Sequence, residues 1–157
     1  MANELFKRVK QTEFDNARQE AMVSLLVAAG HYRQILNDIC ADYGITYDQY
    51  NILRILKGVH PDGHRRYEIS DRMIERAPDV TRLLDRLVKR GLAERSCSTE
   101  DRRCTIARIT DKGLKLLGEM DPDFSKASQH FTRSIPEAEL KQFSGTCNKF
   151  FANLDES

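Results

Sequence analysis

One stretch of the sequence decides the fold, and it runs from Glu68 to Arg108: EISDRMIERAPDVTRLLDRLVKRGLAERSCSTEDRRCTIAR. It predicts a short helix over Glu68–Arg76, a break at Ala77-Pro78, and a second helix from about Asp79 to Arg90. Gly91 follows where the second helix must end, because glycine adopts positive φ without a steric penalty. Two helices joined by a short break therefore open this stretch.

Two short strands complete it, Leu92–Ser96 and Thr105–Ile109, and a polar connection from Cys97 to Cys104 joins them. A helix-turn-helix followed by a β-hairpin is a winged helix, which places its second helix in the major groove of DNA. We therefore predict a mostly α-helical fold with a small β-hairpin wing.

The second helix has two distinct faces. A buried stripe is predicted by apolar residues at i, i+3, i+4, i+7 and i+8. These residues are Val80, Leu83, Leu84, Leu87 and Val88. The opposite face is polar and mostly basic, and consists of Thr81, Arg82, Asp85, Arg86, Lys89 and Arg90.

Residues of the first turn of a recognition helix contact base edges. Here that turn consists of Asp79, Val80, Thr81 and Arg82, and Arg86 lies one turn further on. Arginine suits the O6/N7 edge of guanine, aspartate accepts from cytosine N4, and threonine contacts the thymine methyl group. We predict that these residues bind DNA. The alternative is the solvated charged face that most amphipathic helices carry.

The hairpin carries the run Glu100-Asp101-Arg102-Arg103. Successive residues of an extended chain point to opposite faces, so the two arginines must differ in role. We expect Arg102 to reach DNA and Arg103 to turn inward and pair with Asp101 or with Asp85 of the second helix. Such a pair would join wing and helix. The alternative is an ordinary charged hairpin tip.

Four blocks of sequence, in matching order and spacing, resemble the multiple-antibiotic-resistance regulator (MarR) family. The blocks are Asp79–Leu87, Lys89–Leu92, Glu100–Arg103 and Ile109–Gly113. The resemblance extends to Ile45–Tyr50 and to the helical ends of the chain. It implies a homodimeric winged-helix transcription regulator that binds a pseudo-palindromic operator in double-stranded DNA. Such a regulator is usually a repressor and is often released by a small ligand.

Both ends of the chain predict amphipathic helices. The first spans Phe14–Tyr43, and the last places Leu140, Phe143, Cys147, Phe150, Phe151 and Leu154 on one side. A second subunit would cover the extra apolar surface. We thus predict dimerisation helices over residues 1–45 and 125–157, with the winged helix over residues 46–124. Alternatively, the two helices pack on each other within one subunit.

An effector pocket is expected where the first helix, the second helix and the winged domain meet. His31, Tyr32, Tyr47 and Tyr50 combine polar tips with apolar bodies and are its candidates. Ordinary packing would explain each of them equally well.

Local signals predict the remaining boundaries. Thr46 and Gln49 fit a capping box at the start of a helix that ends at Gly58, and His60–His64 is predicted to be a solvated loop. Thr110 is predicted to cap the next helix, which we expect to bend near Asp121-Pro122.

Charge supports nucleic-acid binding. The whole chain has a net charge of +1, but residues 65–112 hold thirteen basic and nine acidic residues, a net charge of +4. Positive charge is thus concentrated where phosphates would be bound.

Other functions are disfavoured. The eight glycines form no phosphate-binding motif, and we predict no catalytic residues, no cofactor and no metal site. Four dispersed cysteines favour reduced thiols in the cytoplasm, and we expect neither a signal peptide nor a membrane span. The remaining alternative to a DNA-binding regulator is a winged helix that serves as a protein-interaction module in a larger assembly.

Overall fold

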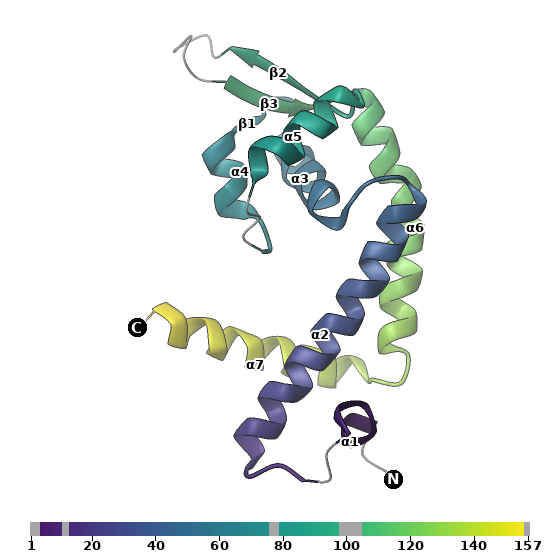
Figure 1. The fold of residues 1–157 in the computed structure, drawn as a ribbon, viewed down its shortest axis with the longest axis vertical. Helices are drawn as coiled ribbons and strands as arrows, with labels where there is room; N and C mark the ends of the chain where they lie inside the picture. The colour runs from purple at the N-terminus through teal and green to yellow at the C-terminus, as the bar shows by residue number, and fades with distance from the viewer. Residues whose placement is uncertain (1–3, 11–12, 76–78, 98–104, 156–157) are drawn as a thin grey trace. The chain divides into compact units, whose positions relative to one another are not determined.

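The fold is seen in a computed structural model that describes residues 4–10, 13–75, 79–97 and 105–155 (Figure 1). The chain forms two compact units, Met1–Phe124 and Ser125–Ser157. The described residues are mostly helical and include a small β-sheet, which confirms the predicted fold class. Among the described residues, none of the helices has the length and apolar character needed to cross a membrane.

Two helices precede the winged helix, α1 (Glu4–Val9) and α2 (Ala17–Asp42). The helix predicted over Phe14–Tyr43 begins later because Asn16 caps it. The Asn16 side chain accepts hydrogen bonds from the backbone N–H groups two and three residues on, at 3.0 and 3.1 Å. Gly44 follows the helix with a φ of +70°, the left-handed conformation that favours glycine where a helix ends.

Helix α3 (Tyr47–Gly58) has the predicted capping box. The Gln49 N–H donates to Thr46 Oγ1 at 3.2 Å, and the Thr46 N–H donates to Gln49 Oε1 at 2.9 Å. Both bonds satisfy backbone donors that have no partner within the helix. The capped start fixes α3 as the central helix of the unit, and its fully buried residues are Ile52, Leu53 and Leu56.

The sheet has three antiparallel strands in the order β1-β3-β2. Strands β2 (Ala93–Cys97) and β3 (Thr105–Ile109) are the predicted hairpin, and Arg95 lies opposite Ala107. Strand β1 (His64–Arg65) was not predicted, since two residues carry no detectable period. The prediction of a loop through His64 is therefore wrong at its last residue.

His64 is buried rather than solvated, with an exposed fraction of 8%. It pairs with Ala107 of β3. Gly63, just before it, has a φ of +80° and lies so close to β3 that a Cβ atom would collide with the Ala107 carbonyl oxygen. Glycine is thus required here for both conformation and close approach, and it lets the chain join the sheet.

Helix α4 (Arg66–Arg72) begins two residues before the predicted helix Glu68–Arg76 and ends earlier. Strand β1 leads directly into it, and the Arg65 N–H donates to Glu68 Oε2 at 2.7 Å. At its C-terminal end Met73 is extended, with a ψ of 135°. The pairing of β1 with β3 therefore sets where α4 begins.

Helix α5 (Val80–Lys89) is the predicted second helix. It ends at Gly91, whose φ of +70° confirms the predicted left-handed cap. The Leu92 N–H then donates to the Leu87 carbonyl at 2.9 Å, which closes the turn into β2.

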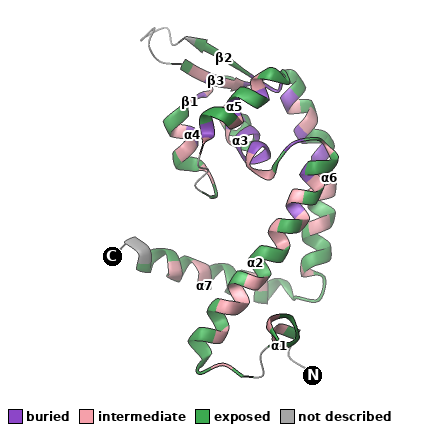
Figure 2. Ribbon diagram, in the orientation of Figure 1, coloured by how far each residue is buried: buried purple, intermediate pink, exposed green. Residues whose placement is uncertain are grey.

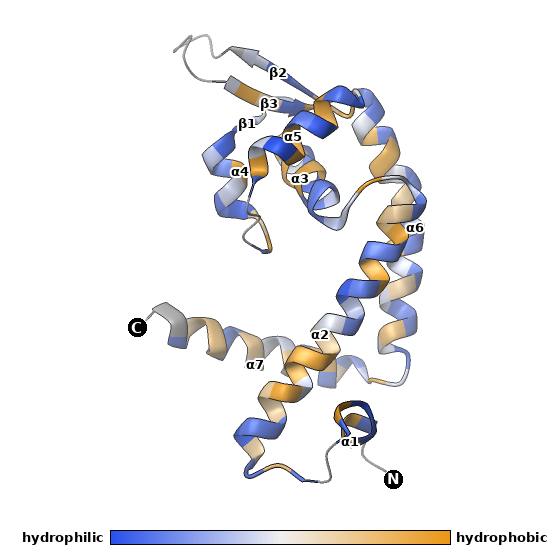
Figure 3. Cartoon of the chain, in the orientation of Figure 1, coloured by the Kyte–Doolittle hydropathy of each residue, from blue (hydrophilic) through white to orange (hydrophobic). Residues whose placement is uncertain are grey.

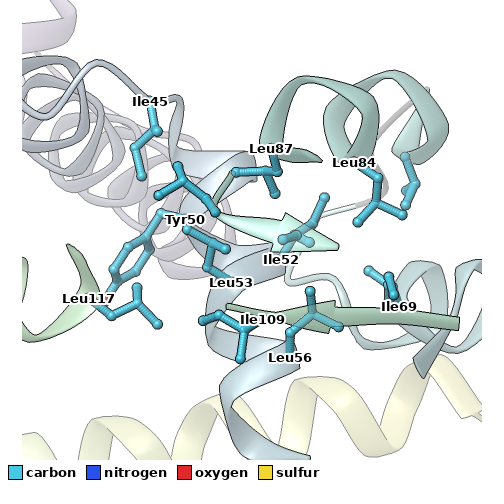
Figure 4. Packing of buried hydrophobic residues seen from close by; sticks show 14 of the residues in the cluster. Ile45, Tyr50, Ile52, Leu53, Leu56, Ile69, Leu84, Leu87, Ile109 and Leu117 are labelled. Atoms are coloured by element: carbon cyan, nitrogen blue, oxygen red, sulfur yellow. The ribbon is translucent and has the colours of Figure 1, made fainter. Parts of the chain in front are cut away.

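The core of the first unit lies between α3, α5, the sheet and α6 (Figure 4). Leu53, Leu56, Leu87 and Leu117 are all fully buried, and Leu84 nearly so. Buried residues gather in this part of the chain, whereas the ends of the chain are mostly exposed (Figure 2). The core therefore fixes the position of α5.

Helix α6 (Asp111–Thr132) is capped by Thr110, whose Oγ1 accepts from the Gly113 N–H at 3.1 Å, as predicted. Pro122 lies inside it, and the bend expected near Asp121-Pro122 stays a prediction. Its C-terminal end belongs to the second unit.

The second unit also contains α7 (Glu137–Asp155), which confirms the predicted last helix. Its apolar side chains are poorly covered, and Phe143 and Phe151 are 55% and 58% exposed. Figure 3 shows apolar residues recurring along this helix.

Candidate nucleic-acid interface

Helix α5 begins with a local arginine–aspartate pair. Asp79 is the N-cap, and its Oδ1 accepts from the Arg82 N–H at 3.0 Å. The other carboxylate oxygen, Oδ2, lies 2.9 Å from Arg82 Nε, and the Arg82 side chain is 81% exposed. The cap thus holds the guanidinium at the first turn while leaving it open to solvent.

The predicted division of α5 into two faces is confirmed by burial. Val80, Leu84 and Leu87 are buried, and Leu83 and Val88 pack partly buried against the same core. Val80 was also placed among the candidate DNA contacts, but its side chain belongs to the core. The exposed residues are Thr81, Arg82, Asp85, Arg86, Lys89 and Arg90.

An ion pair that was not predicted joins α5 to the wing. Arg95 of β2 places Nη1 2.5 Å from Asp85 Oδ1, and its Nη2 donates to the Thr81 carbonyl at 3.3 Å. One guanidinium thus contacts both a side chain and the backbone of α5. The period-2 pattern of the predicted strand could have identified Arg95, because it places Arg95 and Ala93 on one side, and Ala93 is buried.

Sequence analysis predicted that Arg103, paired with Asp85 or Asp101, would join the wing to the helix. Asp101, Arg102 and Arg103 lie outside the described residues, so their roles stay predictions. At the base of the hairpin, Arg108 of β3 bonds to Ser96 and donates from Nε to the Pro61 carbonyl at 3.2 Å. That arginine therefore stabilises the sheet.

A groove lies between α4, α5 and the sheet, beside the exposed face of α5. Its floor is the buried Leu84. The rest of its lining is basic and polar and consists of Arg65, Arg66, Tyr67, Thr81, Arg95 and Thr105. The groove places three arginines of different elements next to the first turn of α5, which is a surface suited to a polyanion.

The candidate effector residues are only partly brought together. Tyr50 is buried, and its ring stacks on Phe124 at 4.1 Å and on Tyr47 at 6.0 Å between centroids. Burial raises the pKa of both tyrosines. His31 is exposed, and its Nε2 lies 2.8 Å from Arg8 Nη1. Tyr47 and Tyr50 thus form one cluster, and ligand binding beside it stays a prediction.

Helix α2 is tied to the winged helix beside that cluster. Arg33 lies over the Tyr47 ring, 5.2 Å from its centroid, and its Nη2 is 3.1 Å from Asp48 Oδ1. It also forms an ion pair with Glu75, in the connection between α4 and α5. Asn51 accepts from the Ile74 N–H in the same connection at 3.0 Å. Sequence patterns gave no sign of this network.

Comparison with known proteins agrees with this geometry. The sequence model of the MarR family matches residues 45–105. The HTH-type transcriptional regulator MhqR of Bacillus subtilis (strain 168) is 25% identical over 126 residues, which cover 78% of this chain and 86% of MhqR.

Solved structures extend the likeness to the whole fold. The S. aureus MepR–DNA complex is 23% identical, with a TM-score of 0.73 over 90% of this chain and 99% of MepR. A MarR transcription factor from Planctomyces limnophilus is 34% identical, with a TM-score of 0.68, and the match covers 87% of this chain and 98% of that one. That identity, over nearly the whole length of both proteins, shows that this chain belongs to the MarR family of transcription regulators.

Proposed function

We propose that this chain is a homodimeric repressor that binds a pseudo-palindromic site in double-stranded DNA and is released by a small ligand. Helix α5 carries the proposal, because its apolar face is buried while Arg95 fixes its exposed polar face to β2. A helix held in this way, with basic side chains outward, fits the major groove of B-DNA.

The first turn of α5 supplies the base contacts in this proposal. Arg82 would address the O6/N7 edge of guanine, Thr81 a thymine methyl group, and Asp79 a cytosine amino group. Arg82 must then leave Asp79 Oδ2. Because exposed ion pairs contribute only about 0–1 kcal/mol, a bidentate base contact can replace this one. Arg86 would contact DNA from the next turn.

The wing supplies a second contact. Arg102 would reach a phosphate or the minor groove, as its place at the hairpin tip suggests. Arg95 already occupies Asp85 Oδ1, so we assign Asp101 as the partner of the inward Arg103.

Homodimerisation is proposed through the helices of both chain ends, residues 1–45 and 125–157. In the first unit, Leu26 of α2 is 72% exposed and Met22 is also exposed. In the second unit, Phe143 and Phe151 of α7 are exposed. A second copy of the chain would bury these side chains and bring two copies of α5 to successive half-sites.

We place the effector near Tyr47 and Tyr50, with His31 and Tyr32 as further candidates. The supporting observation is that Arg33 connects α2, α3 and the connection before α5 at this point. A ligand that moved α2 would thereby act on α5. We propose no catalytic activity, and we place the regulator in the cytoplasm.

The use of this winged helix as a protein-interaction module is less well supported. A protein-binding winged helix needs no exposed basic first turn and no arginine-lined groove, whereas both are present here. Charge on this face therefore favours DNA over a protein partner.

Selection of duplexes from a random pool tests the proposal. The protein should enrich a pseudo-palindromic site, and Arg82→Ala should cost about 1–3 kcal/mol while relaxing preference at one base pair per half-site. Lys115→Ala, which removes an exposed positive charge of α6, is the matched control and should leave the selected site unchanged. Recovery of no preferred duplex by the wild-type protein would overturn the proposal.

A further inference from the structure

Arg66 and Tyr67, at the start of α4, are the residues of the basic groove that no role so far explains. Both are exposed, Tyr67 by 53%. Within the described part of the chain, neither Arg66 nor the Tyr67 hydroxyl makes a hydrogen bond or ion pair. Arg66 differs in this respect from Arg95 and Arg108, the nearby arginines of the sheet that bond within the protein.

Those other arginines serve the fold. Arg95 holds Asp85 and the Thr81 carbonyl, and Arg108 bonds to Ser96 and the Pro61 carbonyl. Their guanidinium groups are already used by the protein. The Arg66 guanidinium makes no such contact, so its N–H donors are available for a ligand.

The position of Arg66 is rigidly set. Arg65 pairs with Ile106 in the sheet, and its N–H is held by Glu68 Oε2. Strand β1 and the first turn of α4 are therefore one fixed element on the edge of the wing sheet. The backbone that carries Arg66 is therefore held at a defined position beside α5, which is a condition for clamping a rigid partner.

The carboxylates near this site do not neutralise it. Glu68 accepts from the Arg65 N–H and lies 3.5 Å from His64 Nδ1, so it is directed at these neighbours. Asp85 is paired with Arg95 across the groove. Asp71 is exposed in the last turn of α4. Among the described residues that line the groove, three are arginines and none is acidic.

We infer that Arg66 and Tyr67 clamp the sugar-phosphate backbone that borders the major groove occupied by α5. The inference rests on the proposed DNA-binding function. Thr81, a candidate base contact, lines the same groove, so DNA read by the first turn of α5 passes over the start of α4. Arginine and tyrosine both donate to phosphate oxygens, and such contacts fix register without reading sequence. In helix-turn-helix proteins the first helix crosses the backbone.

The two residues should contribute differently. The arginine carries charge and releases condensed counterions when it meets a phosphate, whereas the tyrosine hydroxyl adds a hydrogen bond without charge. Only the loss of Arg66 should therefore change how binding depends on salt.

The test is titration of full-length protein against its selected duplex and against mismatched duplexes at several salt concentrations. Arg66→Ala should weaken binding about tenfold, equally on all sequences, and lower the slope of log K against log salt by about one. Tyr67→Phe should weaken binding about threefold with an unchanged slope. Arg66→Lys should retain the wild-type slope, because the charge remains.

Lys115→Ala is the matched control for removal of one exposed positive charge, because the Lys115 side chain on α6 is 80% exposed and has no assigned role. If Arg66→Ala behaves like Lys115→Ala while the wild-type protein binds its site, this inference is overturned and the proposed function stands. If Arg66→Ala relaxes preference at one base pair, Arg66 is a base contact and the backbone clamp is wrong. If the wild-type protein prefers no duplex, the proposed function fails and this inference fails with it.

Discussion

Helices α5 and α7 both carry an apolar stripe, but only one of the two stripes is covered. Leu84 and Leu87 of α5 are 1% and 0% exposed, whereas Phe143 and Phe151 of α7 are 55% and 58% exposed. The same spacing of apolar residues thus produces a core in one helix and an open surface in the other. Periodicity predicts that one side of a helix will be buried. It does not predict whether that side is buried by the same chain or by another molecule.

This difference distinguishes the part of the chain that buries its own apolar side chains from the part that does not. The core of the winged helix is closed by its own helices and sheet together with Cys40 near the end of α2. The terminal helices leave large apolar side chains in solvent, namely Met22 and Leu26 of α2 and Phe143 and Phe151 of α7. Four changes test the contrast.

The largest effect should follow from removing the open surface. Ending the chain before Pro136 deletes α7, and we expect loss of both dimerisation and specific DNA binding, because a single half-site contact retains little affinity. Analytical ultracentrifugation and a gel shift measure the two losses. A truncated chain that stays dimeric at low concentration would assign dimerisation to another surface.

A change in the closed core should act on stability instead. Leu87→Ala should destabilise the chain by about 2–5 kcal/mol, since it removes a fully buried side chain and leaves a cavity. Phe143→Ala should cost the isolated subunit far less, because that side chain is largely exposed. Chemical denaturation at low protein concentration compares the two variants, and equal losses would show that α7 is covered within one chain.

The third change concerns the pair between α5 and the wing. Arg95→Ala should weaken DNA binding by about 1–2 kcal/mol, because it releases Asp85 and the Thr81 carbonyl and leaves α5 less firmly positioned. Asp85→Ala should produce a similar loss, and the double variant should lose little more than either. Additive losses in a double-mutant cycle would show that the two residues act separately.

The smallest effect should come from Glu68, at the start of α4. The Arg65 N–H and, to a smaller extent, the charge of His64 hold the pKa of Glu68 below its usual value of 4.5. A carboxylate with a lowered folded pKa stabilises the protein above its unfolded pKa, and this stabilisation is lost as pH falls through the folded pKa. Glu68→Gln keeps the capping geometry without the charge. The variant should be slightly less stable at pH 7, and the difference should shrink as pH falls below 4.5 and through the lowered folded pKa of Glu68. A difference independent of pH would contradict this assignment.

Sequence patterns located most of the fold because its signals are local. The capping box at Thr46 and Gln49, the left-handed Gly91 and the stripe of α5 each depend on neighbouring residues. Strand β1 was missed because it is defined by a partner more than forty residues away in the sequence. The same reason explains why α4 was placed two residues too late.

The candidate site was predicted unevenly for the same reason. The exposed face of α5 follows from its period, but the Arg95–Asp85 pair depends on how β2 lies against α5. The groove at Arg66 is lined by residues of α4, α5 and all three strands of the sheet, and no local pattern brings them together. Contacts between elements need the fold, even when each element is evident in the sequence.

The ion pair between Asp79 and Arg82 has a consequence for how quickly the protein finds its site. On non-specific DNA the phosphates must compete with the Asp79 carboxylate for the Arg82 guanidinium. Because Arg82 is already held by its own cap, it adds little to the phosphate contacts made while the protein slides along DNA. Asp79→Asn retains a good N-cap but frees the guanidinium. The variant should bind random duplexes several-fold more tightly and dissociate from them more slowly, as stopped-flow kinetics would show. We therefore expect the helix cap of the wild-type protein to shorten each unproductive encounter with DNA.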